Sequence, residues 1–394
     1  MKNKFVRKLC SLVMAGLMVM GTASAVMADT AASFSGDGTT AISTIPFDVT
    51  LTAATGLSLP GTSFSYTIAP VAQDDISDEG VTEGVEGAVA LPENPTAAFT
   101  AGDTRPATVQ IPLTVDNNNL EANKVYRYAI TQAKMSDAQV DSGILNEAGT
   151  GAADVRYLDI YTNGSKNVVY AVLFKSGTRS PGDTEIEYSS KDASFDNTFG
   201  KAGTVTEGDD RTDTKGVKTV TLSKTGTGNN VSADTEFPFT VTFSDLDTND
   251  ALTMTGVVYT VAYGADGKAA YGGDGDAPAA YKIGSIYNYK IKVGGTITFT
   301  VPNNVSVSVD ETTEEGYTIT ATTEGLIDST TVSPNASGKV YDANAVITFN
   351  NHRGVASPTG IVLRYAPYFL IAGLAAALLL FFRRRNVDSG SDMI

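Results

Sequence analysis

Short runs in which apolar and polar residues alternate recur along most of the chain. Four examples are Phe47–Leu51, Phe64–Ile68, Val125–Ile130 and Thr296–Val301. An alternation of two matches the way successive side chains of a β-strand point to opposite faces. Polar turn signals such as Asn163-Gly164 separate the runs. The pattern predicts many short, half-buried strands and only one short helix, over 137–148.

The strand pattern indicates an all-β protein. Many short strands separated by polar turns are typical of β-sandwiches. The body of the chain, 29–359, has about 331 residues, which is enough for two domains. A polar stretch over 200–216 separates two similar halves. We therefore expect two tandem immunoglobulin-like β-sandwich domains, spanning 29–214 and 215–355.

The two halves share a weak repeat of short motifs. Leu51 lies 13 residues before Phe64-Ser65-Tyr66, and Lys224 lies 13 residues before Phe237-Pro238-Phe239. Later, Gln132 ends one strand of the first half as Glu311 ends one of the second. Each half then closes on a strand with an aromatic-any-Asn motif: Phe195-Asp196-Asn197 and Phe349-Asn350-Asn351.

The first residues have the features of a secretory signal peptide. Basic residues precede an apolar stretch, 9–21, and small residues follow it at Ala23, Ser24, Ala25 and Ala28. This order is typical of an exported chain. We expect cleavage after Ala28, with cleavage after Ala25 as the alternative, so that residues 1–28 are removed.

The C-terminal segment, 356–394, combines a short motif, an apolar run and a basic cluster. Ser357-Pro358-Thr359-Gly360 precedes an uncharged stretch, 366–382, and three arginines, 383–385. That stretch is at the short limit for a membrane span, and the arginines favour a cytoplasmic end. The combination resembles the sorting signal of Gram-positive sortase substrates, with cleavage between Thr359 and Gly360. The adjacent Pro and Thr depart from the commonest pattern, Leu-Pro-any-Thr-Gly, and resemble the motifs of some pilus subunits. A plain single-pass membrane protein is the alternative.

Composition narrows the function classes. Residues 29–359 keep 20 of the 28 basic and 42 of the 44 acidic residues, a net charge of −22, which disfavours nucleic acid as a partner. The only cysteine, Cys10, lies in the signal peptide, so the mature chain cannot form a disulfide. The only histidine is His352, which excludes histidine-based zinc sites. The acidic run 245–250 fails the EF-hand pattern at its sixth position, Asp250. We expect no metal and no cofactor.

The order of the motifs resembles the backbone pilins of Gram-positive pili. In the second half, a lysine strand, a Phe-any-Phe strand, a glutamate strand and an aromatic-any-Asn strand precede the sorting signal. The likeness is to the two-domain streptococcal type with internal isopeptide bonds, and it covers nearly the whole mature chain. It implies two β-sandwiches of the Cna type.

The resemblance implies an isopeptide bond within the second domain. Lys224 would be the nucleophile, Glu311 the assisting acid and Asn351 the acceptor. Asn351 shares a strand face with Phe349, two residues before it, whereas Asn350 points to the opposite face. Burial would favour a neutral lysine and a protonated glutamate. Folding would supply the proximity, so the reaction needs no enzyme.

The first half departs from this pattern. Leu51 takes the lysine position and Gln132 the glutamate position, so that only Asn197 remains. The paired loss is physically consistent, because a buried glutamate without its lysine would be a costly unpaired acid. We expect no isopeptide bond in the first domain.

A backbone pilin also needs a lysine that attacks the Thr359 acyl-enzyme of the next subunit. The Tyr-Pro-Lys motif of many pilins is absent from the sequence. In the resembled type, this lysine lies shortly before the Asn strand of the first domain. Lys191, six residues before Asn197, is the candidate, with Lys175 and Lys201 as rivals.

These observations predict a structural pilus subunit on the cell surface. The only chemistry expected of the chain itself is autocatalytic bond formation, so it is not expected to be an enzyme. The expected partners are a pilus-type sortase, identical subunits in a head-to-tail polymer, peptidoglycan and ancillary pilins. A monomeric wall-anchored adhesin built from the same modules is the alternative.

Overall fold

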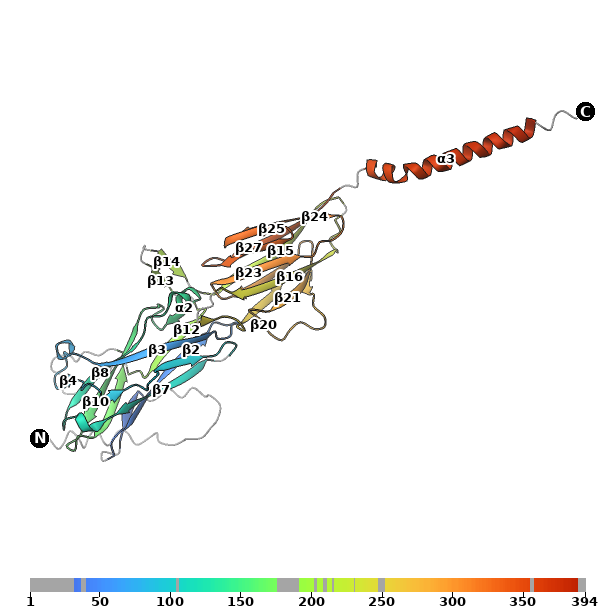
Figure 1. Cartoon of the computed structure of the whole chain (residues 1–394). Helices are drawn as coiled ribbons and strands as arrows, with labels where there is room; N and C mark the ends of the chain where they lie inside the picture. Colours follow the sequence, from blue (N-terminus) through green and yellow to red (C-terminus); the bar gives the residue numbers. More distant parts are fainter. Residues whose placement is uncertain are drawn as a thin grey trace, which may run out of the picture.

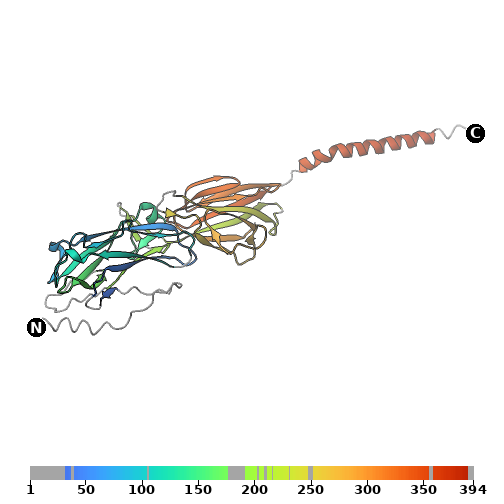
Figure 2. The ribbon, with the colours of Figure 1, turned by 60° about the horizontal axis from the view of Figure 1, so that its bottom comes forward.

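A computed structural model describes residues 32–36, 40–103, 106–175, 191–201, 204–207, 211–214, 216–229, 231–246, 252–354 and 358–388. For 204–207, 211–214, 358–365 and 383–388 it describes the backbone only. The described chain forms two β-sandwiches arranged end to end, with a long helix beyond the second (Figures 1 and 2). The all-β fold predicted from the alternating pattern is confirmed.

Thirteen strands build the first sandwich: β1 (Ser33–Ser35), β2 (Thr44–Ala53), β3 (Gly61–Pro70), β4 (Val81–Glu83), β5 (Val89–Ala90), β6 (Thr96–Phe99), β7 (Ala107–Val115), β8 (Val125–Gln132), β9 (Ile144–Asn146), β10 (Asp154–Thr162), β11 (Val168–Phe174), β12 (Ser194–Phe199) and β17 (Leu252–Thr253). One sheet has the order β1-β11-β10-β8-β3-β17, with β4 beside β8 and β6 beside β3. The other has the order β5-β7-β2-β12-β9. The strand β17 comes from the second half of the chain.

Twelve strands build the second sandwich: β15 (Lys218–Gly228), β16 (Glu236–Asp245), β18 (Val258–Tyr263), β19 (Ala269–Tyr271), β20 (Tyr281–Lys282), β21 (Ile286–Lys292), β22 (Thr296–Val301), β23 (Val305–Glu311), β24 (Tyr317–Glu324), β25 (Leu326–Val332), β26 (Asn335–Val340) and β27 (Ala345–Arg353). Its sheets have the orders β20-β18-β22-β15-β27-β24 and β19-β21-β16-β23-β26-β25. In both sandwiches the early and last long strands pair in parallel, β2 with β12 and β15 with β27.

The alternation seen in the sequence becomes an alternation of burial. Along β15, every second residue from Lys218 to Lys224 is buried, because successive side chains of a strand point to opposite faces. The residues of β12 and β22 alternate in the same way. The buried apolar side chains of both sandwiches form one continuous core.

Little of the described chain is helical. The short helix expected over 137–148 is α2 (Asp137–Asp141), which Ser136 and Gln139 begin with a capping box. It ends early, because Gly143 has a φ of +87° and the chain then enters β9. Two 3₁₀ turns, η1 (Gln73–Asp75) and η2 (Asn117–Asn119), and a hairpin of β13 (Thr204–Glu207) and β14 (Arg211–Thr214) complete the connections.

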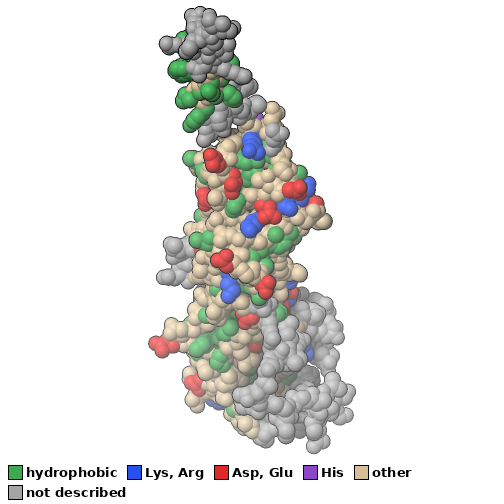
Figure 3. Space-filling view, turned by 90° about the vertical axis from the view of Figure 1, so that its right-hand side faces the viewer, with side chains coloured by type: hydrophobic (Ala, Val, Ile, Leu, Met, Phe, Trp, Pro, Cys, Tyr) green, Lys and Arg blue, Asp and Glu red, His purple; other side chains and the backbone are tan. Residues whose placement is uncertain are grey.

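The long helix α3 spans Pro358–Asp388. The apolar side chains of 366–382 are mostly exposed along it (Figure 3). Among the described residues, no helix combines the length and the apolar character needed to cross a membrane. The assignment of 356–394 to a sorting signal stays a prediction, as does that of the signal peptide, 1–28, which lies outside the described residues.

Candidate crosslink site

The parallel pair β15–β27 places Lys224 and Asn351 on one interior face. In its register Lys224 lies opposite Phe349, and Gly226 lies opposite Asn351. Asn351 is therefore one residue pair further along the same face, because the face repeats every second residue. Lys224 and Asn351 are both fully buried.

Glu311 reaches the same place from the opposite sheet. It lies at the end of β23, opposite Phe239 of β16, and is 2% exposed. Its Oε2 lies 3.0 Å from Nζ of Lys224. Its Oε1 accepts a hydrogen bond of 2.5 Å from Nδ2 of Asn351. The structure thus brings together all three residues predicted for the second-domain site, with the carboxyl group between the amine and the carboxamide.

Aromatic rings surround the three polar groups. Nζ of Lys224 lies 4.4 Å from the ring centroid of Phe237 and 5.8 Å from that of Phe239. The ring of Phe239 also contacts Phe349 edge to face, at 5.3 Å between centroids. The site is therefore shielded from water by apolar side chains.

Burial shifts both titrating groups toward their neutral forms. It lowers the pKa of Lys224 from 10.5 to about 8, although the negative charge and hydrogen bond of Glu311 act against this. Burial likewise raises the pKa of Glu311 above its ordinary value, against the influence of Lys224 and Asn351. A neutral amine can act as a nucleophile, and a protonated carboxyl can donate a proton.

The carboxamide of Asn351 has an unused acceptor. Its Oδ1 is buried and forms no hydrogen bond within the part of the chain that the structure describes. A buried polar atom without a partner is unfavourable in a folded protein. Reaction at the carboxamide carbon would change the groups around this oxygen, so the arrangement is suited to attack by the lysine.

Asn350 belongs to the opposite face of β27. Its side chain joins a row of exposed polar groups, accepting from Thr225 Oγ1 and donating to Thr227 Oγ1, each at 3.2 Å. This placement turns its carboxamide away from Glu311. The geometry favours Asn351 over Asn350 as the acceptor.

A glycine turn holds the backbone of Lys224. Its N–H donates to the carbonyl of Gly295 at 3.1 Å, and its carbonyl accepts from the N–H of Gly294 at 2.8 Å. Gly294 has a φ of +83°, a conformation that favours glycine. The sequence analysis did not connect this turn to the site, although the Gly-Gly pair before an alternating strand was a visible turn signal.

The first sandwich holds a neutral set at the corresponding place. Nε2 of Gln132 donates to Oδ1 of Asn197 at 2.8 Å, and both residues are 1% exposed. The hydroxyl of Tyr66 donates to Oε1 of Gln132, also at 2.8 Å. Tyr66 was not among the predicted site residues. It pairs with Gln132 in the sheet as Phe239 pairs with Glu311, and its hydroxyl gives the amide a partner.

The lysine position of the first sandwich differs from the one predicted. Leu51 is fully buried, but it lies opposite Asn197, where the second sandwich has Gly226 opposite Asn351. Val49 lies opposite Phe195, as Lys224 lies opposite Phe349. The equal spacing of 13 residues misled because Phe64 follows Val49 by two residues more than Phe237 follows Lys224.

The three candidate acceptor lysines have different surroundings. Lys191 is exposed and forms an isolated antiparallel bridge with Phe174, and Lys201 is exposed just after β12. Lys175 forms ion pairs with Asp192, at 2.8 Å, and with Glu147. Burial alone would lower the pKa of Lys175, but its hydrogen bonds to the two carboxylates outweigh this and raise the pKa. Lys175 is therefore held in the charged form, which is a poor nucleophile.

The remaining predicted residues lie at the edge of the described chain. Ser357 lies outside the described residues, and Pro358, Thr359 and Gly360 are described only as backbone in the first turn of α3. Within the described ranges, no group of three or more acidic, histidine or cysteine side chains is placed to hold a metal ion. The acidic run after Asp245 falls largely on 247–251, outside those ranges.

Comparisons with known proteins place the chain among pilin folds. A family model described as a domain of unknown function, DUF7601, matches residues 218–353. No curated protein matches the chain. The major pilin protein T-13 from Streptococcus pyogenes is 19% identical, with a TM-score of 0.53, and the match covers 82% of this chain and 100% of that one.

Two further solved structures agree with this likeness. A second major pilin from Streptococcus pyogenes is 18% identical, with a TM-score of 0.53, covering 79% of this chain and 99% of that one. The S. pyogenes major pilin T3.2 is 16% identical, with a TM-score of 0.51, covering 79% and 100%. The fold implied by the resemblance in the sequence is thus confirmed across nearly the whole of these proteins.

Proposed function

We propose that the chain is a structural subunit of a cell-surface pilus, polymerised head to tail by a pilus-type sortase. The observation that carries the proposal is the buried set of Lys224, Glu311 and Asn351, which joins an early strand of the second sandwich to its last one. The likeness to major pilins over both sandwiches supports it. A charge of −22 on 29–359 suits an exported, soluble subunit.

The three residues support formation of an intramolecular amide bond. Neutral Lys224 attacks the carboxamide carbon of Asn351 with Nζ, and the carboxyl of Glu311 carries a proton from the amine to the departing Nδ2. The C–N bond to Nδ2 breaks, the bond to Nζ forms, and ammonia leaves. One amine and one carboxamide thus give one secondary amide and one ammonia, with no further reactant.

The bond would close a long loop in a chain that cannot form disulfides. Residues 224 and 351 are 127 positions apart. In the chain-entropy model, a crosslink over such a loop stabilises the folded state by about 5 kcal/mol. It also ties β15 to β27 covalently, which suits a subunit placed under tension.

Polymerisation would use the two ends of the mature chain differently. The carbonyl of Thr359 would form an acyl-enzyme with the sortase, and the exposed amine of Lys191 on another copy would replace the enzyme. Anchoring to peptidoglycan would be the fate of the last subunit, and ancillary pilins would be further partners.

Electrophoresis of cell-wall extracts tests the polymer. Samples boiled in detergent from a sortase-competent host are expected to show a ladder of covalent multimers, which disappears when Thr359 is changed to Ala. A single band of subunit size would overturn the pilus subunit and support the monomeric wall-anchored adhesin.

A further inference from the structure

The second domain supplies a strand to the first. Leu252 and Thr253 form β17, which pairs with Thr62 and Gly61 at the beginning of β3. The strand thereby extends a sheet whose other members, apart from β17, all precede residue 175. A backbone pairing of this kind is the same interaction by which one protein adds a strand to another.

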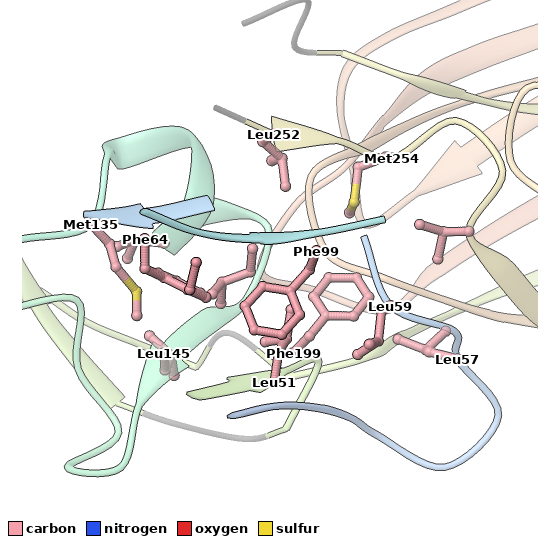
Figure 4. Close-up of a cluster of buried hydrophobic side chains, with 14 of the residues drawn as sticks. Leu51, Leu57, Leu59, Phe64, Phe99, Met135, Leu145, Phe199, Leu252 and Met254 are labelled. Carbon is pink, nitrogen blue, oxygen red and sulfur yellow. The ribbon is translucent and has the colours of Figure 1, made fainter. Parts of the chain in front are cut away.

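Apolar side chains accompany the donated strand into the first domain. Leu252 is 1% exposed and Met254 is fully buried. They lie over Phe99, Leu57 and Leu59, at the end of the first sandwich that faces the second (Figure 4). Without them, this end of the core would be open to water, which is unfavourable for apolar surface.

The donated segment is fixed at its base to the second domain. The carboxylate of Asp245 accepts a hydrogen bond of 2.6 Å from the N–H of Met254. The N–H of Gly256 donates to the carbonyl of Ile283 at 2.9 Å. The strand is therefore presented by the second domain and is not a loose tail that happens to rest on the first.

Two further contacts close the junction around the segment. Ser58 and Val258 are joined twice, by Ser58 N–H to the carbonyl of Val258 at 3.2 Å and by Val258 N–H to Ser58 Oγ at 2.7 Å. Nδ2 of Asn303 donates to the carbonyl of Asp141 at 2.7 Å, and the Tyr341 hydroxyl donates to Oδ1 of Asp141 at 2.9 Å. Contacts from separate loops of the second domain leave little freedom for a hinge.

We propose that the segment 252–258 of the second domain completes the core of the first domain, so that the first domain depends on the second for its stable fold. The dependence runs one way, because Leu252 and Met254 close the first sandwich while the strands around Lys224 lie elsewhere in the second. An exported chain emerging from its N-terminus would therefore finish its first domain only after the second has appeared. The proposal does not rest on assembly into a pilus.

Hydrogen–deuterium exchange on the purified mature chain tests this dependence. The double variant Leu252→Asp, Met254→Asp places charges in the junction core, and Ile286→Asp, at a site 68% exposed on the second domain, is the matched control. In the double variant, amides of β3, β6 and β12 are expected to exchange about tenfold faster or more, while those of β15 and β27 are unchanged. The control is expected to match the parent protein.

Two results would overturn the proposal. One is unchanged protection of β3, β6 and β12 in the double variant. The other is equal loss of protection in both sandwiches, which would mean that the dependence is not directed from the second to the first. If the double variant is not secreted, Met254→Ala serves in its place, with the same reading of the same strands.

Discussion

Nζ of Lys224 and Oε2 of Glu311 meet at 3.0 Å although the two residues lie on opposite sheets and 87 positions apart, with both side chains fully buried. A buried ion pair is costly to form, and it is weak evidence of a stabilising role. The hydrogen bond from Asn351 to the same carboxyl gives the pair a chemical purpose. The predictions below begin from this relationship.

Replacing Glu311 by Gln should prevent the crosslink. The amine and the carboxamide remain, but the proton carrier between them is lost. The intact mass of the mature chain is expected to equal its sequence mass, whereas the parent chain should be lighter by one ammonia. Thermal unfolding should move to lower temperature, because about 5 kcal/mol of loop restriction disappears. Glu324→Gln, on an exposed position of β24, is the control and should keep the lighter mass.

The unreacted site should make stability depend on pH. An Asn351→Ala variant keeps Lys224 and Glu311 but has no acceptor. The pKa of Lys224 is about 8 in the folded state and 10.5 when unfolded, so between these values the unfolded chain binds more protons. The free energy of unfolding should therefore rise from pH 8 to 10.5, by on the order of 3 kcal/mol.

A second substitution isolates this effect. Adding Lys224→Met to the Asn351→Ala variant removes the titrating amine, and the rise between pH 8 and 10.5 in denaturant titrations should vanish. A rise that persists would assign it to another group. The raised pKa of Glu311 acts in the opposite sense, because its contribution is lost as pH increases through its folded value.

Lys191→Ala should abolish the covalent ladder of multimers on electrophoresis. Its exposed amine is available to a sortase acyl-enzyme, whereas that of Lys175 is held charged between two carboxylates. Lys175→Ala and Lys201→Ala are the matched controls and should retain the ladder. An unchanged ladder in Lys191→Ala would remove this residue as the acceptor.

The first domain should accept a crosslink if the register identifies its lysine position correctly. The triple variant Val49→Lys, Tyr66→Phe, Gln132→Glu recreates the amine, aromatic and carboxyl positions around Asn197. Its mass should fall by a second ammonia. Unfolding should require about 5 kcal/mol more, for a loop of similar length to that of the second domain. The same variant with Leu51→Lys in place of Val49→Lys should lose only one ammonia.

Much of the fold and of the site could be read from the sequence, for a local reason. Alternation of apolar and polar residues sets strand faces, so Asn351 and not Asn350 could be assigned to the interior before the register was known. The order of Lys224, Glu311 and Asn351 fixed the set without any distance. Such inferences succeed because they need only the period of a strand.

The parts that could not be predicted depend on contacts between distant segments. Leu51 was assigned the lysine position by equal spacing, but pairing with β12 gives that place to Val49. The hydroxyl of Tyr66 bonds to Gln132 across the sheet, which no local pattern reveals. The two-residue strand β17 is too short for a periodic signal, and only the packing of Leu252 and Met254 identifies its role.

The parallel pairing of β15 with β27 has a mechanical consequence. The chain enters β15 from the side of the first domain and leaves β27 toward α3, so a pull along the molecule draws the two strands in opposite directions (Figure 1). Their hydrogen bonds are then strained in shear, all together, instead of opening one at a time as in a zip. β2 and β12 repeat this geometry in the first domain. Resistance to shear is therefore built into the strand order of both sandwiches, and the bond at Lys224 would add to it in the second.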